Sequence, residues 1–137
     1  MLSVSTEDRS YAAAFLDGEG SISIDGQPGG SHGCRLMIAV ANIRPSVLDW
    51  LVARWGGSVY KRGVREGERP CWQWAIASRG AQRFLEDVFP YLKIKRWQAA
   101  TALRFRQVVG TPGARIADAD RAAQQELKRA LMALNHA

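Results

Sequence analysis

Two carboxylates separated by a single glycine stand where an alanine-rich segment gives way to an alternating one. They belong to the run Asp17-Gly18-Glu19-Gly20, which follows the small and apolar residues 12–16. A helix C-terminus exposes unpaired carbonyl groups and the negative end of the helix dipole, so acidic side chains there are locally unfavourable. A divalent cation would offset that cost, and oxygen ligands suit Mg²⁺. The run therefore indicates a metal site at a helix end; the alternative is a glycine helix stop with two hydrated acids.

The same segment carries small residues at helical spacing. Ala14 and Gly18 are four residues apart, and small residues at that spacing allow two helix backbones to approach closely. The pattern favours a helix–helix contact, with an ordinary buried helix as the alternative.

The charge of the chain indicates the chemistry of a partner. The net charge is +6 over 137 residues and the isoelectric point is about 9.9, which favours a polyanionic partner. Residues 1–43 hold two basic and five acidic residues, whereas residues 44–110 hold thirteen basic and five acidic ones. An acidic opening before a basic middle suggests a cation site beside a phosphate-binding surface. A solvated basic face without a partner is the alternative.

The hydrophobic pattern predicts an α+β domain with the order α-ββ-α-ββ-α, followed by a C-terminal helix. Period-two alternation predicts four strands, at 21–25, 35–42, 58–62 and 71–77. Helices are expected from Ser5 to about Gly18 and over 45–55, 81–88, 94–109 and 116–135. The four strands should form one antiparallel, saddle-shaped sheet with the helices on its apolar face. Residues 1–110 are expected to be the core, and residues 111–137 a linker and helix packed on the same domain.

Several classes of protein are excluded by composition. The apolar share of 47% and the charged share of 23% are ordinary for a globular domain. No apolar run approaches the ~20 residues of a membrane span, and residues 1–10 lack the pattern of a secretory signal. Cys34 and Cys71 lack zinc or disulfide-framework spacing, so both are expected as buried, reduced thiols. We expect a protein of the cytoplasm, or of an organelle matrix, that is not secreted and has no small-molecule cofactor.

Residues 12–20, AAAFLDGEG, resemble the nine-residue motif of the LAGLIDADG homing endonucleases. The following Ser-Ile-Ser-Ile is similar to the first strand of that family. Further matches are the GGSVY turn at 56–60, the Trp-x-Trp-x-Ile strand at 72–76 and the PYLKIK segment at 90–95. The resemblance covers about residues 8 to 106 in one consistent order. It implies the LAGLIDADG endonuclease fold.

The chain departs from the family pattern at two places. The leading L-A-G is A-A-A, which implies a slightly wider helix crossing. The metal-binding aspartate is replaced by Glu19, which keeps an oxygen ligand but moves it outward by one methylene.

The resemblance implies a site-specific double-strand DNA endonuclease. One copy of the motif implies a homodimer, with Ala13, Ala14, Asp17 and Gly18 at the interface. Glu19, with Gly18, would bind Mg²⁺ for phosphodiester hydrolysis at a long, near-palindromic site. Mn²⁺ is expected to substitute, and Ca²⁺ to bind without supporting cleavage.

Asn42 and Lys95 match two further catalytic positions of the family. Asn42 matches a position that orders water near the metal, and Lys95 a lysine near the attacking water or the phosphate. Each has an alternative: Asn42 as a cap for the helix that Pro45 opens, and Lys95 as one more residue of a basic helix.

The predicted open face of the sheet supplies the DNA-contacting residues. They alternate along the four strands and comprise Ser21, Ser23, Asp25, Arg35, Met37, Tyr60, Lys61, Arg62 and Gln73. Tyr60 and Arg62 share a parity, and Lys61 would take their place only if the strand carried a bulge. Two other functions remain open on this scaffold: a catalytically inactive DNA-binding regulator, and a maturase that binds intron RNA.

Overall fold

The computed structural model describes residues 1–28, 30, 33–62, 65–108 and 117–137. The elements follow one another as α1 (Thr6–Glu19), β1 (Gly20–Gly26), β2 (Cys34–Asn42), α2 (Pro45–Trp55), β3 (Ser58–Lys61), β4 (Trp72–Ala77), α3 (Ser78–Val88), a 3-10 turn η1 (Phe89–Tyr91), α4 (Arg96–Gln107) and α5 (Asp118–Asn135). The predicted α+β class and the order α-ββ-α-ββ-α are therefore confirmed. Part of the predicted linker, residues 111–116, lies outside the described residues.

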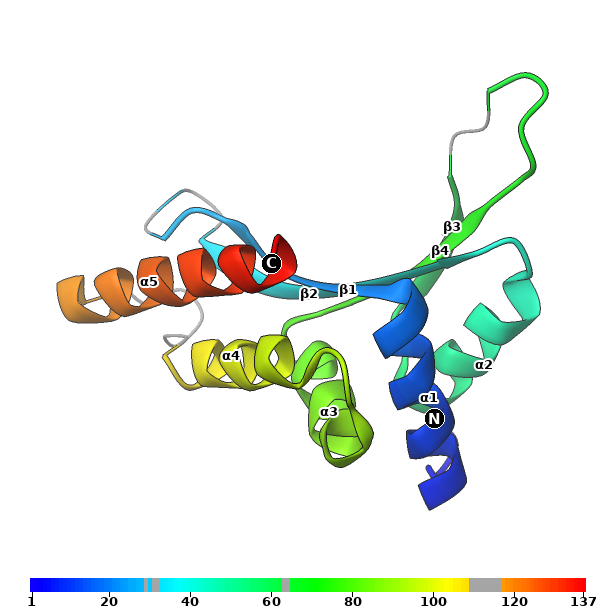
Figure 1. Ribbon diagram of the computed structural model, residues 1–137, viewed down its shortest axis with the longest axis horizontal. Coiled ribbons are helices and arrows are strands. Elements are labelled where there is room, and N and C mark those ends of the chain that lie inside the picture. Colours follow the sequence, from blue (N-terminus) through cyan, green and yellow to red (C-terminus); the bar gives the residue numbers. More distant parts are fainter. Residues whose placement is uncertain (29, 31–32, 63–64, 109–116) are drawn as a thin grey trace.

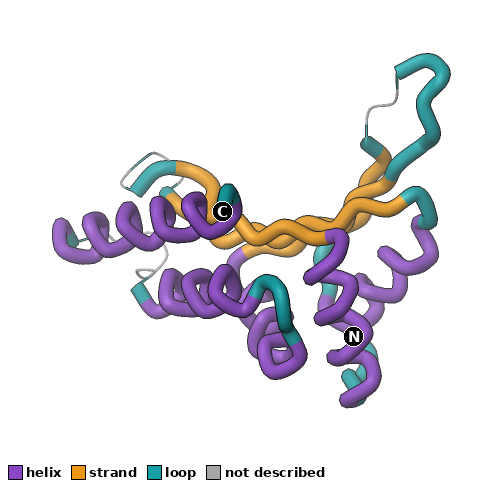
Figure 2. The backbone as a smooth tube through the Cα atoms, viewed as in Figure 1, coloured by secondary structure: helices purple, strands orange, loops and turns teal. Residues whose placement is uncertain are grey.

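One sheet organises the molecule. Its strand order is β1-β2-β4-β3, and all three pairings are antiparallel. Helices α1 to α4 lie on one side, and both ends of the sheet curve away from them, so the uncovered face is concave (Figure 1). Figure 2 shows the same separation of strands and helices into two layers.

Alternation along the strands decides what each face carries. Ile22, Ile38, Val40 and Trp74 are almost fully buried under the helices. In the register, Ile38 lies opposite both Ile22 and Ile76, and Val40 lies opposite Trp74. Because side chains alternate along a strand, the residues between these point to the concave face.

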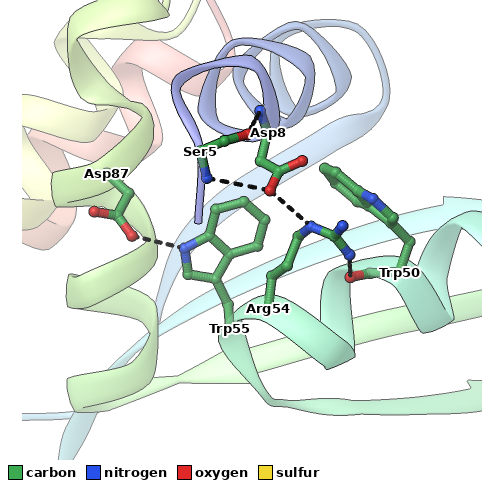
Figure 3. A network of polar contacts seen from close by, with 6 residues as sticks. All are labelled: Ser5, Asp8, Trp50, Arg54, Trp55 and Asp87. Atoms are coloured by element: carbon green, nitrogen blue, oxygen red, sulfur yellow. Dashed lines mark hydrogen bonds and ion pairs between the residues drawn. The ribbon is translucent and has the colours of Figure 1, made fainter. Parts of the chain in front are cut away.

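Polar contacts at the start of α1 join the first three helices (Figure 3). Ser5 and Asp8 form a capping box, in which each side chain accepts a hydrogen bond from the other's backbone N–H. The Asp8 carboxylate lies 3.0 Å from Nε of Arg54 on α2. The indole Nε1 of Trp55 donates to Asp87 on α3 over 2.9 Å. These bonds set the positions of α1, α2 and α3 relative to one another.

Helix α5 lies along β1, the edge strand. Lys128 Nζ donates to the carbonyl oxygen of Gly26, and Asn135 Nδ2 donates to that of Ile22 over 2.8 Å. Gln124 Nε2 donates to the carbonyl oxygen of Val108, just after α4. The helix therefore pairs with edge carbonyls that a neighbouring strand would otherwise take.

Neither cysteine is in a disulfide, and both are half-buried rather than fully buried. Burial raises the pKa of the Cys34 thiol, and the charge of Lys128 offsets part of that rise. Within the described residues no helix is both long and apolar enough to span a bilayer.

The capping box should make stability depend on pH. The backbone N–H of Ser5, with help from Arg54, holds the pKa of Asp8 below its usual value. The stabilisation is therefore present above about pH 4, where the unfolded aspartate is ionised, and is lost as pH falls through the lower folded pKa. In urea unfolding, the stability difference between wild type and Asp8→Asn should shrink on going from about pH 6 to about pH 2.5. A constant difference would contradict this account.

Two neighbouring residues test the docking of α5. Leu131 is 1% exposed and Met132 is 51% exposed. Leu131→Ala should lower the free energy of unfolding by about 2–5 kcal/mol because it removes buried volume, whereas Met132→Ala should change it by about 0.5 kcal/mol or less. Urea unfolding followed by tryptophan fluorescence measures both. Equal effects would mean that α5 does not pack as described.

Candidate functional site

The run of acids and glycines lies where α1 passes directly into β1. Glu19 is the last residue of the helix and Gly20 the first of the strand. A Cβ at Gly20 would lie 2.5 Å from Leu16 Cδ1 and 3.0 Å from the Leu16 carbonyl oxygen, so a side chain here would require Leu16 to shift. Gly18 and Glu19 are both exposed. The Glu19 carboxylate is therefore presented to solvent beside the sheet, where a ligand can reach it.

Asp17 has a different role from Glu19. Its carboxylate accepts hydrogen bonds from the backbone N–H groups of Lys93, over 2.8 Å, and Lys95, over 3.0 Å. The Lys95 ammonium in turn donates to the Asp17 carbonyl oxygen over 2.7 Å. Asp17 thus caps the segment before α4 within its own chain, and its carboxylate is engaged there. The resemblance implied that Asp17 lies at a dimer interface, and nothing in the local sequence indicates this bond between residues 78 positions apart.

Asn42 lies at the end of β2, opposite Trp72. Its Oδ1 accepts a hydrogen bond from the Arg44 N–H over 2.8 Å, in the turn before α2. This is a local turn contact. Helix α2 has Arg44 at its N-cap position and no side-chain cap, so the expectation that Asn42 caps this helix is not met.

The structure brings the three predicted catalytic residues to one region of the molecule. Lys95 is bonded to Asp17, two residues before Glu19. Gly20 lies opposite Val40, two residues before Asn42. The end of α1, the segment before α4 and the end of β2 therefore meet at this point.

The donor set fits Mg²⁺ better than a metal that needs a complete protein cage. In the part of the chain that the structure describes, no three His, Cys, Asp or Glu side chains gather into a metal cluster. Mg²⁺ keeps several waters and is commonly held by one or two carboxylates together with substrate phosphates. A single exposed Glu19 meets the protein's share of that requirement.

The outward face of α1 consists of Tyr11, Ala14 and Gly18, which are all exposed. A Cβ built on Gly18 meets nothing within 4 Å, so a second helix has room to approach there. Ala13 is 0% exposed and packs in the core of its own chain. The expectation for Ala13 is corrected accordingly: one helical position, about 100°, separates it from the face of Ala14.

The predicted DNA-contacting residues divide between two regions of the concave face. At one end Asp25 lies opposite Arg35, with Ser23 Oγ donating to Asp25 over 3.0 Å. At the other end Gln73 Nε2 donates to the Tyr60 hydroxyl over 2.6 Å. Ser21 and Met37 lie between these ends, opposite Ala39 and Ser23 respectively.

Alternation along β3 places the side chain of Lys61 on the opposite side of the sheet from those of Tyr60 and Arg62. The register from Ser58 to Lys61 is regular and contains no bulge. Lys61 lies opposite Trp72, and its ammonium is 5.8 Å from the centre of that ring. Arg62 continues the ladder through its N–H, which donates to the Cys71 carbonyl. Tyr60 and Arg62 therefore point to the concave face, and Lys61 points to the opposite side.

Solved structures of homing endonucleases share this architecture. The homing endonuclease I-CvuI in complex with its target matches 94% of this chain and 82% of its own, with a TM-score of 0.73 and 21% identity. The archaeal intron-encoded homing endonuclease I-Vdi141I complexed with DNA matches 95% and 91%, with a TM-score of 0.75 and 13% identity. The LAGLIDADG meganuclease I-AabMI bound to uncleaved DNA matches 90% of this chain but 44% of its own, with a TM-score of 0.67 and 15% identity. No protein-family model and no curated protein sequence matches the chain.

The class that these observations define is an α+β protein with a concave, helix-backed antiparallel sheet. Its fold is that of the LAGLIDADG homing endonucleases. The resemblance predicted from residues 12–20 and the later segments is thus confirmed at the level of the fold.

Substitution of Asp17 and substitution of Glu19 should have different effects on the free energy of unfolding. Asp17→Ala should lower the free energy of unfolding by about 2 kcal/mol, because two backbone N–H groups lose a charged acceptor. Glu19→Ala should change it by about 0.5 kcal/mol or less, because Glu19 is exposed. Equal losses in urea unfolding would contradict the division of roles between them.

Proposed function

We propose that this chain is a site-specific, Mg²⁺-dependent double-strand DNA endonuclease that acts as a homodimer. The observation that carries the proposal is the end of α1. There, an exposed Glu19 ends the helix at the start of the sheet, and Asp17, two residues before it, holds Lys95 through two hydrogen bonds. A carboxylate and a lysine in this position match the chemistry of phosphodiester hydrolysis.

Glu19 would hold the cation, with the Gly18 carbonyl as a further oxygen donor. Bound Mg²⁺ would supply charge stabilisation for the phosphate oxygens. Lys95 has three N–H donors, of which the Asp17 carbonyl takes one. The ammonium therefore keeps donors for a phosphate oxygen, where it would stabilise developing negative charge. Asn42 would position water through the donor and acceptor capacity of its side-chain amide that the hydrogen bond from the Arg44 N–H does not use.

The chain offers one such acid and one such sheet, whereas a double-strand cut needs two cleavage centres. The exposed face of Ala14 and Gly18 suits the close approach of a second α1. The 44% coverage of the I-AabMI chain is what one unit of a two-unit protein would give. A dimer through α1 would bring two copies of Glu19 close to the two-fold axis and place the two sheets on successive half-sites.

The concave face would lie along a major groove. A net charge of +6, concentrated in residues 44–110, would contribute phosphate affinity that weakens with salt. Base contacts would come from the polar side chains at the two ends of the face, Asp25 and Arg35 at one and Tyr60, Arg62 and Gln73 at the other.

A cleavage selection tests this function. The protein is incubated with a random pool of duplexes in Mg²⁺, and both the cut ends and the bound duplexes are sequenced. The expected result is a long, near-palindromic consensus with staggered cuts at its centre. In Ca²⁺ the same consensus should appear among bound duplexes, without cutting. A bound consensus that is never cut in Mg²⁺ would instead indicate a regulator, and preference for structured RNA would indicate a maturase.

Glu19→Ala is the matched variant for that selection. It should bind the selected duplex within about twofold of wild type and cut it at least 100-fold more slowly, since a group that acts on the reaction contributes about that factor or more. Cutting at the wild-type rate by this variant would show that Glu19 is not part of the cleavage site.

A further inference from the structure

The centre of the concave face is built from small and methyl-bearing side chains. The register places Ser21, Ala39, Ala75 and Ser58 in one row across all four strands. The next row holds Ser23, Met37 and Ala77. The long polar side chains lie on either side of these rows, around Arg35 and around Gln73. The middle of the face is therefore chemically different from its two ends.

These rows open into a hollow at the start of β3. The hollow has a volume of about 460 Å³ and lies at the sheet edge that the short β3 leaves open. Its lining comes from the concave face through Arg35, Met37, Ser58, Ala75 and Ala77, and from the helix side through Trp55, Ile76 and Gly80. It forms because β3 begins opposite Ala75, while β4 continues to Ala77. Gly57 borders the hollow with a φ of 85°, and a Cβ there would lie 2.6 Å from the Ala75 carbonyl oxygen. The backbone thus requires glycine at this edge. On the concave side, the apolar side chains of Met37, Ala75 and Ala77 lie between the polar Arg35 and Ser58.

An apolar surface facing a major groove has one strongly matched partner there. The C5-methyl group of thymine is the apolar feature of the groove, and alanine and similar side chains recognise it by contact. The side chains of Met37, Ala39, Ala75 and Ala77 offer no N–H or O–H donor and no oxygen acceptor, so hydrogen-bonding edges of guanine, adenine or cytosine placed against them would lose water without gaining a partner. The basic charge of the chain supplies the general attraction to DNA, so the methyl contacts would supply selectivity.

We propose that Met37, Ala39, Ala75 and Ala77 recognise thymine C5-methyl groups in the middle of each half-site. The inference rests on the proposed function, because it requires the concave face to lie in a major groove. It makes these four residues determinants of specificity, with the polar ends of the face reading the flanking base pairs.

Replacing thymine by deoxyuridine tests the proposal, because it removes the methyl group and leaves the base pairing unchanged. Each thymine of the selected duplex is replaced in turn, and the dissociation constant is measured in Ca²⁺. We expect about fourfold weaker binding at one or more positions in the middle of each half-site, the effect of losing one buried methyl group. Positions outside the middle should change by less than about twofold.

A pair of variants assigns the contact to the protein surface. Met37→Gln keeps the length of the side chain but makes it polar, and it should abolish the preference for thymine over deoxyuridine at one of those positions. Met37→Leu keeps the side chain apolar and should retain the preference. Ala122→Ser, at an exposed position on α5, is a control that should leave every ratio unchanged.

The outcomes separate this proposal from the proposed function. If no duplex is selected, the proposed function fails before deoxyuridine is tested. If a consensus is found and deoxyuridine is harmless at every central position, or the centre holds no thymine, the function stands and the methyl proposal is overturned. Retention of the full thymine preference by Met37→Gln also overturns it.

Discussion

The passage from α1 into β1 without a loop is the constraint on which the site depends. Glu19 ends the helix and Gly20 starts the strand, and the absence of a Cβ at Gly20 allows the backbone to pass against Leu16. Because no residues intervene, the acid at the helix end lies beside the sheet. The position of Glu19 is therefore a consequence of packing and not of a flexible loop, which suits the metal-holding role proposed for it.

Asp17, the other acid of the run, ties the end of α1 to the segment before α4. Asp17 accepts two backbone hydrogen bonds from the segment before α4, and its carbonyl receives the Lys95 ammonium. Two carboxylates at a helix end are locally unfavourable. In the structure the two carboxylates lie in different surroundings. The Asp17 carboxylate is hydrogen-bonded within the fold, and the Glu19 carboxylate is left to solvent, where a cation would offset its charge. Under the proposed function, Asp17 contributes to stability and Glu19 to ligand binding.

The sheet shows which features an alternating sequence pattern can predict and which it cannot. Polar and apolar positions along β1, β2 and β4 indicate correctly which residues face the helices. The pattern cannot give the rows across the sheet, since these depend on register between strands that are distant in sequence. Only the register sets Ala39 beside Ala75 and Met37 beside Ala77. The apolar centre of the concave face therefore cannot be recognised from any single strand.

Local rules were sufficient for the elements and their order. Alternation predicted the strands, Ser5 and Pro45 marked helix starts, and the resemblance over about residues 8 to 106 predicted the fold. Contacts between distant residues needed the tertiary structure: the bond between Asp17 and Lys95, the pairing of α5 with the edge of β1, and the burial of Ala13 one helical position from an exposed face. The physical reason is that hydrogen-bond geometry and side-chain period are short-range and repeat along the chain. Which distant partner satisfies a given group is decided only when the elements pack together.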